Sequence, residues 1–274
     1  MTRRQLLTGL ASLAVATVVF ILPFLFVLIN AAKTPAEASQ PSFAWPSEWH
    51  LWSNLVEVVQ VRDYALLLAY FNSIVITVGA MTLLVIFAAM VGYVLQRRPT
   101  RFSKFVEFTA LAGLMIPPAV VPTIWVLQQV NLFKTIHGMI LIQVAYGLSF
   151  CILLFRAFIS SIPRDLDEAA IVDGATPLQV FFRVILPLLK PVTLTVIVVQ
   201  SITIFNDFTH PLYYLPGAEN ITVQLTLYNF QSQFTSQLNL LFMNILLITI
   251  PPLLVFVFFN RQIVAGMTSG AVKG

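Results

Sequence analysis

The chain has 274 residues, of which 58% are hydrophobic and 9% are charged, with a mean hydropathy of +0.89 and a net charge of +4. Because a soluble globular domain carries about 25% charged residues, this composition excludes an ordinary water-soluble domain and indicates that lipid is the main solvent. The basic residues stand in short gaps between apolar runs, so their excess is no nucleic-acid signature. The single cysteine, Cys151, excludes an intrachain disulfide and a cysteine-based metal site, and we expect it to be a small buried apolar residue.

Six stretches are apolar enough to cross a bilayer as helices, since a spanning helix needs about 20 mainly apolar residues. In chain order they are residues 6–32, 66–95, 105–130, 139–158, 192–215 and 238–260. No charged residue occurs between Asp63 and Arg97, or between Glu219 and Arg261. The alternation typical of barrel strands is missing, so the pattern predicts an all-α integral membrane protein.

The first stretch needs a separate interpretation, because residues 2–7, Thr-Arg-Arg-Gln-Leu-Leu, resemble a twin-arginine export signal. The apolar part of a signal peptide is about 7–15 residues long and ends at a cleavage site of small residues. Here the apolar run continues until Lys33. We therefore favour a retained membrane anchor over a cleaved signal.

The distribution of lysine and arginine predicts the orientation, because cytoplasmic loops carry an excess of both. With a cytoplasmic N-terminus, 12 of the 15 Lys and Arg residues fall on the cytoplasmic side, and both termini lie there. The longest external segment then runs from Lys33 to about Ala65 and holds Trp45, Trp49 and Trp52. Tryptophan favours the membrane interface, so we expect this segment to lie along the outer surface, where a docking role for a partner is open.

The loop between the fourth and fifth predicted spans, about residues 159–190, reads as helix, sharp turn, helix. Pro163 can begin the first helix and Gly174 can end it as a C-terminal cap. Thr176 as N-cap and Pro177 at the first position start the second helix. Pro187 disfavours helix at the residue before it and marks the end of the second helix. Such an element could be a rigid knob that a partner grips, or a surface hairpin that only joins two spans.

The same loop carries three short motifs, namely Glu168-Ala169-Ala170, Asp173-Gly174-Ala175 and Ile185-Leu186-Pro187. Together they resemble the cytoplasmic loop signature of bacterial binding-protein-dependent ABC transporter permeases. Asn72-Ser73 at the second span and Asn206-Asp207-Phe208 late in the fifth are also typical of that family. The C-terminal residues 266–274 resemble the tail of its carbohydrate-uptake branch, similar to the smaller maltose- and glycerol-phosphate-type membrane subunits. The resemblance covers nearly the whole chain.

This resemblance implies the six-helix type I ABC importer permease fold with a cytoplasmic coupling-helix loop. It implies a first span and external segment at residues 1–65, a core of five spans at 66–262 and a cytoplasmic tail at 263–274. It places the chain in the bacterial cytoplasmic (inner) membrane and its lipid bilayer. The implied partners are a second permease subunit, two copies of a cytoplasmic ABC ATPase and an extracytoplasmic solute-binding protein. The second permease is a distinct subunit in a heterodimer or, alternatively, a copy of this chain. The chain lacks the Gly-x-x-x-x-Gly-Lys-Ser/Thr loop, so ATP and magnesium are expected on the ATPase, and no cofactor, catalytic residue or metal site in this chain.

The resemblance also implies roles for residues of the loop. The helix at about residues 164–173 would dock in a cleft of the ATPase, and ATP-driven closure would move it as a rigid body. Glu168 would hold the loop through polar contacts with the ATPase or with its own backbone. Gly174 would permit the turn, and the C-terminal tail could touch the ATPase. The residues assigned to coupling are Glu168, Ala169, Ala170, Asp173, Gly174, Leu186 and Pro187.

Polar groups within spans are costly and tend to face a cavity or a partner helix. Those that could contact the solute are Tyr146, Ser149, Gln200, Asn206, Asp207, His210 and Asn244. The alternative for each of them is an interhelical hydrogen bond, and for Asp207 a structural or gating role. Pro117-Pro118, Pro122 and Pro251-Pro252 lie within spans and should kink or break helices there.

The rival interpretations are a stand-alone secondary transporter or channel, a membrane enzyme, and a permease of the same family for a non-sugar solute. A secondary transporter often has internal repeats or charges at midspan, and the sequence displays neither. No His, Asp and Glu cluster has metal-ligand spacing. The C-terminal tail argues against a non-sugar solute. The sequence therefore predicts a sugar-importing permease subunit and no enzyme.

Overall fold

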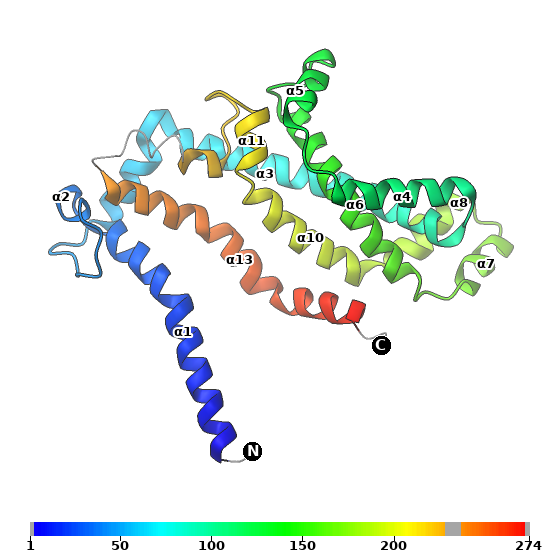
Figure 1. Ribbon diagram of the computed structural model, residues 1–274, viewed down its shortest axis with the longest axis horizontal. Helices are drawn as coiled ribbons and strands as arrows, with labels where there is room; N and C mark the ends of the chain where they lie inside the picture. Colours follow the sequence, from blue (N-terminus) through cyan, green and yellow to red (C-terminus); the bar gives the residue numbers. More distant parts are fainter. Residues whose placement is uncertain (1–2, 228–236, 272–274) are drawn as a thin grey trace. The chain divides into compact units, whose positions relative to one another are not determined.

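The computed structural model describes residues 3–227 and 237–271, and every regular element within those ranges is a helix (Figure 1). The all-α prediction is therefore confirmed. The chain forms two compact units, one of Met1–Tyr70 with Thr222–Pro251, the other of Phe71–Ile221 with Pro252–Gly274. Helices α3 (Leu51–Arg97) and α13 (Leu238–Ala271) each contribute to both units.

The first unit holds α1 (Arg3–Ala31), α2 (Pro35–Ala38) and parts of α3 and α13. Its core is a small apolar cluster in which Ala31, Val58 and Leu66 meet Leu240 and Met243. Polar bonds support this packing, because the Asn239 amide donates to Asn54 Oδ1 at 3.1 Å. Within the expected membrane anchor, Val15–Ala31 forms an apolar helix.

The segment at residues 33–65 contains more helix than the sequence suggested. Thr34 and Glu37 cap α2 reciprocally, as the capping box requires. Hydrogen bonds from Ser47, and then from Thr34, lower the pKa of Glu37 to about 2. After this turn α3 begins at Leu51, and Trp52 on its first turn is 77% exposed. The expected position of residues 33–65 along the outer membrane surface stays a prediction.

Helix α3 is interrupted by a kink at Val61–Tyr64. Arg62, Asp63 and Tyr64 all have positive φ, at 51°, 55° and 63°. The left-handed region costs a non-glycine residue roughly 1–2 kcal/mol, so three in a row mark a strained bend. The helix before the kink belongs to the segment at residues 33–65, which is expected to be external, and the helix after it is the second predicted span.

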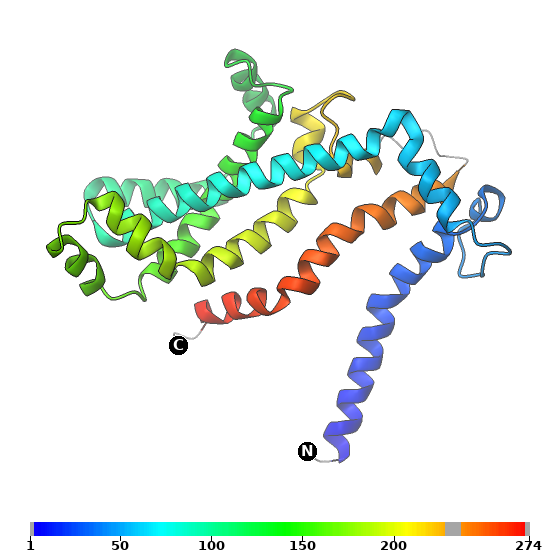
Figure 2. The ribbon, with the colours of Figure 1, turned by 180° about the vertical axis from the view of Figure 1, so that it is seen from behind.

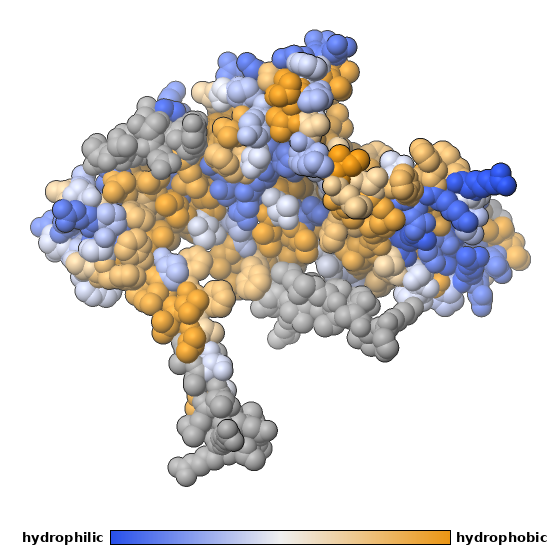
Figure 3. Space-filling view, in the orientation of Figure 1, coloured by the Kyte–Doolittle hydropathy of each residue, from blue (hydrophilic) through white to orange (hydrophobic). Residues whose placement is uncertain are grey.

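The second unit packs around α6 (Ile136–Ile159), which contacts α4 (Arg101–Met115), α10 (Lys190–Phe205) and α11 (Thr209–Tyr214). The core joins α3, α6 and α10, as the two ribbon views show (Figures 1 and 2). Cys151 and Phe155 of α6 are completely buried in it, as expected for Cys151. α3 and α6 approach closely at Gly92, where a Cβ atom would lie only 3.1 Å from Phe155 Cβ. Hydrophobic side chains cover much of the face drawn in Figure 3, and hydrophilic ones gather at the end of this unit that carries α7.

The count of six spans is not confirmed. Three described helices are long and apolar enough to cross a membrane, α3, α6 and Leu238–Phe259 of α13, and a fourth span results if one bent pair is counted. That pair, Pro177–Leu188 with Lys190–Phe205, is bent by 74°. The third predicted span is split, because α4 ends at Met115 and α5 (Val120–Gln129) begins beyond Pro117 and Pro118. The fifth predicted span is split between α10 and α11.

The prolines do not all act as predicted. Pro117 and Pro118 break the third span as expected, whereas Pro122 lies in the first turn of α5 without breaking it. Proline is tolerated in the first turn because the N–H groups there have no intrahelical partner. Of the kink or break predicted at Pro251-Pro252, the break does not occur, because α13 runs through both residues, although the two compact units divide at this pair.

Candidate functional site: the loop between α6 and α10, and a polar cluster on α6 and α11

The loop between α6 and α10, residues 160–189, begins with the short helix α7 (Asp165–Val172). The predicted helix and its cap are confirmed. Gly174 has a φ of +84° and donates its N–H to Ile171 O at 3.0 Å. The next N–H, of Ala175, donates to Ala170 O at 3.0 Å. This pair of bonds is a Schellman motif, which ends a helix on a left-handed residue.

The second half of the loop starts as predicted at Thr176, whose hydroxyl accepts the N–H of Gln179 in a capping box. α8 (Pro177–Gln179) continues without interruption into a π-helical turn, η1 (Val180–Ile185), and α9 (Leu186–Leu188).

The prediction that Pro187 ends this helix is wrong. Ile185 and Leu186 keep helical φ and ψ angles, and the bend comes later, at Leu189. The Leu186 N–H donates to Phe181 O, five residues back. This wider π turn displaces the carbonyl groups that a proline ring meets in a regular α-helix. Pro187 is therefore accommodated, and the helix axis turns only before α10.

The residues of the first motif are exposed on α7. Glu168 and Ala169 face solvent, and Ala170 is half-buried against the core. Within the described residues the Glu168 side chain makes no hydrogen bond or ion pair, so the predicted bond to its own backbone is absent there. Val172, 86% exposed, and Ile171, 59% exposed, add apolar surface. α7 thus presents one carboxylate among small and apolar side chains.

A neighbouring carboxylate, which sequence reasoning missed, holds α7 in place. Asp167 is buried and lies 2.5 Å from Arg97 Nε at the end of α3. The Arg97 guanidinium also donates to Ile162 O at 3.0 Å, just before α7. In return, Arg164 donates to Gln96 O at 3.4 Å. These bonds, which we call the α3–α7 clasp, join α7 to a long core helix.

A second ion pair, between Arg156 of α6 and Glu107 of α4, lies in the same unit. Both side chains are about one-third exposed. This pair joins two helices that already pack closely, whereas the clasp joins the loop to the core.

The second part of the candidate site is a cluster around Asp207, which follows α10. The Asp207 carboxylate accepts hydrogen bonds from Gln143 at 2.5 Å and from the His210 main chain at 3.2 Å. The His210 ring lies 2.6 Å from the same carboxylate and stacks on Tyr146 with centroids 4.4 Å apart. Tyr146 in turn lies 3.5 Å from the Tyr214 hydroxyl.

The structure therefore brings together three residues assigned to the solute pathway, Tyr146, Asp207 and His210. Sequence reasoning missed Gln143 and Tyr214. Gln143 lies one helical turn before Tyr146 on α6, and that spacing is a signal that could have found it. The cluster combines polar groups with aromatic rings, which is the combination a sugar needs.

The remaining pathway residues have other surroundings. Ser149 lies against Gly113 of α4, where an added Cβ would meet Ser149 Oγ at 2.6 Å. Gln200 is buried beside Gly147 of α6, and Asn206 is exposed at the end of α10. Asn244 belongs to the first unit, where its amide donates to Thr226 Oγ1 at 3.1 Å. Over residues 3–227 and 237–271 no group of His, Cys, Asp and Glu could hold a metal ion.

Comparison with known protein families identifies the family to which the chain belongs. Residues 85–269, more than half of the chain, match the family described as the binding-protein-dependent transport system inner membrane component. The chain belongs to this family. It is an ABC transporter permease subunit of the inner membrane, which it crosses more than once. Subunits of this family carry no catalytic activity.

Several relatives of this permease are named for sugars. A trehalose transport system permease protein of Mycobacterium tuberculosis is 35% identical over 210 residues, 75% of this chain and 77% of the relative. A melibiose/raffinose/stachyose import permease protein of Bacillus subtilis is 28% identical over 266 residues, 95% of this chain and 94% of the relative. A diacetylchitobiose uptake system permease protein of Streptomyces coelicolor is 29% identical over 269 residues, 96% of this chain and 87% of the relative.

The fold of the permease is also that of a solved transporter. A crystal structure of a bacterial ABC transporter that imports the acidic polysaccharide alginate superposes with a TM-score of 0.81. The match has 20% sequence identity and covers 95% of this chain and 98% of that chain. A second structure, with a TM-score of 0.64 and 15% identity, shows the alginate transporter in complex with a periplasmic protein bound to an alginate pentasaccharide, and covers 94% of this chain and 93% of that chain. The ABC importer permease fold is therefore confirmed.

Proposed function

We propose that this permease forms half of the translocation pathway of an ABC importer for a sugar or sugar-like solute, and that its α6–α10 loop couples the pathway to an ATPase. The observation that carries the coupling role is the exposed α7, fixed to α3 by a buried ion pair between Arg97 and Asp167. The sugar assignment rests on the sugar-transport relatives.

The proposed coupling is mechanical. The ATPase grips the exposed face of α7 around Glu168, and closure of the ATPase pair displaces α7. Because Asp167 and Arg97 tie α7 to the end of α3, the displacement is passed to that helix. The Schellman turn at Gly174 passes it to η1 and then to α10. Motion of these helices alternates the access of the pathway between the two sides of the membrane.

The proposed assembly contains a second, distinct permease subunit, two copies of a cytoplasmic ABC ATPase and an extracytoplasmic solute-binding protein. ATP and magnesium bind to the ATPase, since the sequence of this chain has no phosphate-binding loop. A solute-binding protein accords with the family description and with the complex known for the alginate transporter.

The proposed topology has six spans, two of them broken, with both termini in the cytoplasm. The third span is α4 with α5, and the fifth is α10 with α11. Broken spans are tolerated where the freed backbone is covered by protein or lines a water-filled path. The bias of 12 among the 15 basic residues toward one side supports this orientation. In this arrangement residues 1–65 form the first span and external segment, 66–262 the core and 263–274 the tail, of which residues 272–274 lie outside the described ranges.

The proposed solute contacts centre on the cluster around Asp207. His210 and Tyr146 stack next to its carboxylate, which gives an aromatic platform beside hydrogen-bonding groups. Ser149, Gln200, Asn206 and Asn244 remain further candidates along the pathway.

Purification tests the proposal directly. The permease is tagged and expressed in a cell that also produces the other proposed subunits of the transporter. It is then extracted in a mild detergent and isolated through the tag. We expect an ABC ATPase and a second permease to be retained, and ATP hydrolysis to rise when solute-loaded binding protein is added. If the purified chain conducts solute in vesicles with no ATPase present, it is a stand-alone transporter or channel and the proposal is wrong.

A further inference from the structure

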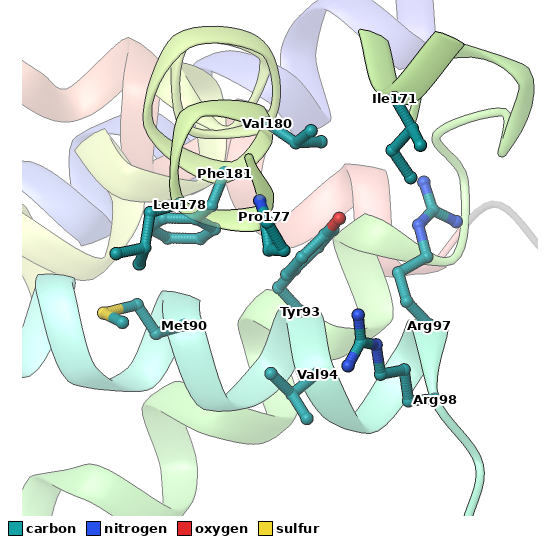
Figure 4. A pocket seen from close by; sticks show the side chains of 10 residues that line it. All are labelled: Met90, Tyr93, Val94, Arg97, Arg98, Ile171, Pro177, Leu178, Val180 and Phe181. Atoms are coloured by element: carbon teal, nitrogen blue, oxygen red, sulfur yellow. The ribbon is translucent and has the colours of Figure 1, made fainter. Parts of the chain in front are cut away.

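A pocket beneath the α6–α10 loop is not used by the coupling mechanism. It holds about 680 Å³ of empty space, including its open mouth, between the end of α3 and the start of the second loop helix. Its walls are largely apolar and aromatic, as Figure 4 shows; they are formed by Met90, Tyr93, Val94, Ile171, Pro177, Leu178, Val180 and Phe181. Arg97 and Arg98 also line it.

The two arginines differ in what they bind. Arg97 is occupied by the clasp with Asp167. Arg98 is exposed, and among the described residues its guanidinium has no hydrogen-bond or ion-pair partner. The Tyr93 hydroxyl, also in the pocket wall, likewise makes no hydrogen bond to any described residue. Beside its apolar walls the pocket therefore offers one unpaired positive charge, that of Arg98. It also offers two hydrogen-bond donors that no described residue uses, the Arg98 guanidinium and the Tyr93 hydroxyl.

The surroundings of the pocket indicate a lipid rather than a soluble anion. Met90, Tyr93 and Val94 belong to the last uncharged turns of a spanning helix. The chain after α3 alternates basic and aromatic residues, with Phe102 74% exposed and Phe105 64% exposed. Arg101 precedes Phe102 and Lys104 precedes Phe105, and neither basic side chain has a partner among the described residues. Basic residues directly after a spanning helix attract anionic lipids, and basic pockets between helices bind their headgroups.

We propose that this pocket binds an anionic phospholipid of the inner leaflet, with its phosphate at Arg98 and Tyr93 and an acyl chain along Val94, Leu178 and Phe181. The inference rests on the proposed orientation, which places the end of α3 in the cytoplasmic leaflet. A phosphate accepts charge-assisted bonds from guanidinium, and the apolar walls remove acyl surface from water. The lipid then fills the space between α3 and the coupling loop and supports the loop from the membrane side.

Native mass spectrometry of the delipidated transporter complex tests the site. The complex is titrated with phosphatidylglycerol or with phosphatidylcholine of the same acyl chains. We expect phosphatidylglycerol to bind about tenfold more tightly, because phosphatidylcholine has the same phosphate but also a choline cation, which Arg98 repels. Arg98→Gln should remove this preference, and Val94→Trp, which obstructs the pocket mouth, should weaken both lipids.

Arg183→Gln is the matched control, because Arg183 is an exposed loop arginine outside the pocket without a partner among the described residues, and it should leave the preference unchanged. Glycerol phosphate, the headgroup without acyl chains, should not displace the lipid. Equal affinity for the two lipids, or an unchanged preference in Arg98→Gln, would overturn the proposal. So would loss of ATPase from Arg98→Gln with lipid binding intact, because the occupant would then be an acidic surface of the ATPase. If the wild-type complex retains no ATPase at all, the coupling proposal fails instead.

Discussion

Asp167 and Glu168 are adjacent acidic residues in the first turn of α7, but their surroundings differ. The Asp167 side chain is only 10% exposed and faces Arg97, while Glu168 is exposed and makes no side-chain bond to a described residue. We therefore assign them different tasks: Asp167 positions the helix, and Glu168 is available to a partner.

Asp167→Asn should destabilise the loop, because it leaves the buried Arg97 guanidinium without a counter-charge. Breaking a buried ion pair by removing one partner costs about 3–5 kcal/mol. We expect a lower thermal midpoint of the complex, and uptake that falls more than basal ATP hydrolysis. Glu168→Gln should leave the midpoint unchanged and reduce retention of the ATPase.

A double substitution separates this positioning role from general damage. Replacing both partners of a buried pair by apolar residues is often neutral, so Arg97→Met combined with Asp167→Leu should be more stable than either single variant. If the three variants unfold with strictly additive losses, the pair is not coupled and the clasp does not position α7.

Gly174 is held by its backbone angle and not by lack of space, since no atom lies within 4 Å of an added Cβ. Its φ of +84° is costly for side chains other than Asn and Asp. Gly174→Asn should therefore keep most uptake, whereas Gly174→Val should lower it strongly and increase proteolysis of the loop. Equal uptake by the two variants would show that the left-handed turn is dispensable.

At this scale the sequence predicted what local chemistry determines. The Gly174 cap and the Thr176 N-cap follow from residues within one turn. The clasp could not be predicted, because Arg97 and Asp167 are brought together only by the packed helices. In the sequence, Asp167 is indistinguishable from an acidic residue that complements a helix dipole.

At the scale of the helix, Thr176 carries the start of the second loop helix. Its hydroxyl accepts from the Gln179 N–H, and the Gln179 side chain accepts from the Thr176 N–H at 2.8 Å. Thr176→Val should cost about 1 kcal/mol of stability and speed exchange of the Leu178 and Gln179 amide hydrogens. Thr176→Ser, which keeps the hydroxyl, should behave as wild type, and an effect of similar size in both variants would contradict the capping role.

At the kink in α3 we expect a substitution to raise stability rather than lower it. Asp63 is exposed and has a φ of 55°, so Asp63→Gly should raise stability by about 1 kcal/mol because glycine adopts this angle without strain. Glu57→Gly, also exposed but in regular helix, should lower stability by about 1 kcal/mol. Thermal unfolding of the two variants should thus shift in opposite directions; a loss in both would mean that α3 is straight at Asp63.

Helix boundaries were harder to predict than helix identity. The break at Pro117-Pro118 was predicted correctly, whereas Pro187 and Pro251 lie inside continuous helices. A proline breaks a helix only where nothing relieves its clash with the preceding turn, and the π turn before Pro187 supplies that relief. The helix beginning at Leu51 was missed because its sequence mixes polar and apolar residues and precedes the apolar run.

For the whole molecule, the orientation can be measured with single cysteines in a Cys151→Ala background. Gln40 and Val172 are both exposed, on the external segment and on α7 respectively. In intact cells a membrane-impermeant maleimide should label Gln40→Cys, and Val172→Cys only after permeabilisation. The reverse pattern would invert the proposed topology, and with it the leaflet of the lipid pocket.

At this scale the sequence predicted the helical class and the membrane setting, because composition acts over the whole chain, whereas the family was predicted from the resemblance of short motifs in the loop. The number of spans was less well determined. Length and hydropathy count apolar residues, but breaks such as those between α4 and α5, and between α10 and α11, depend on packing within the second unit.

The α3–α7 clasp has a consequence for exchanging parts between transporters. A loop transplanted from a relative as residues 160–189 would carry its own partner for position 97 but leave the recipient's residue there. Chimaeras should therefore work only when the donor supplies an acid at position 167 or when the end of α3 is exchanged as well. The exchangeable module is discontinuous, made of one loop and the end of a helix that precedes it by some 60 residues.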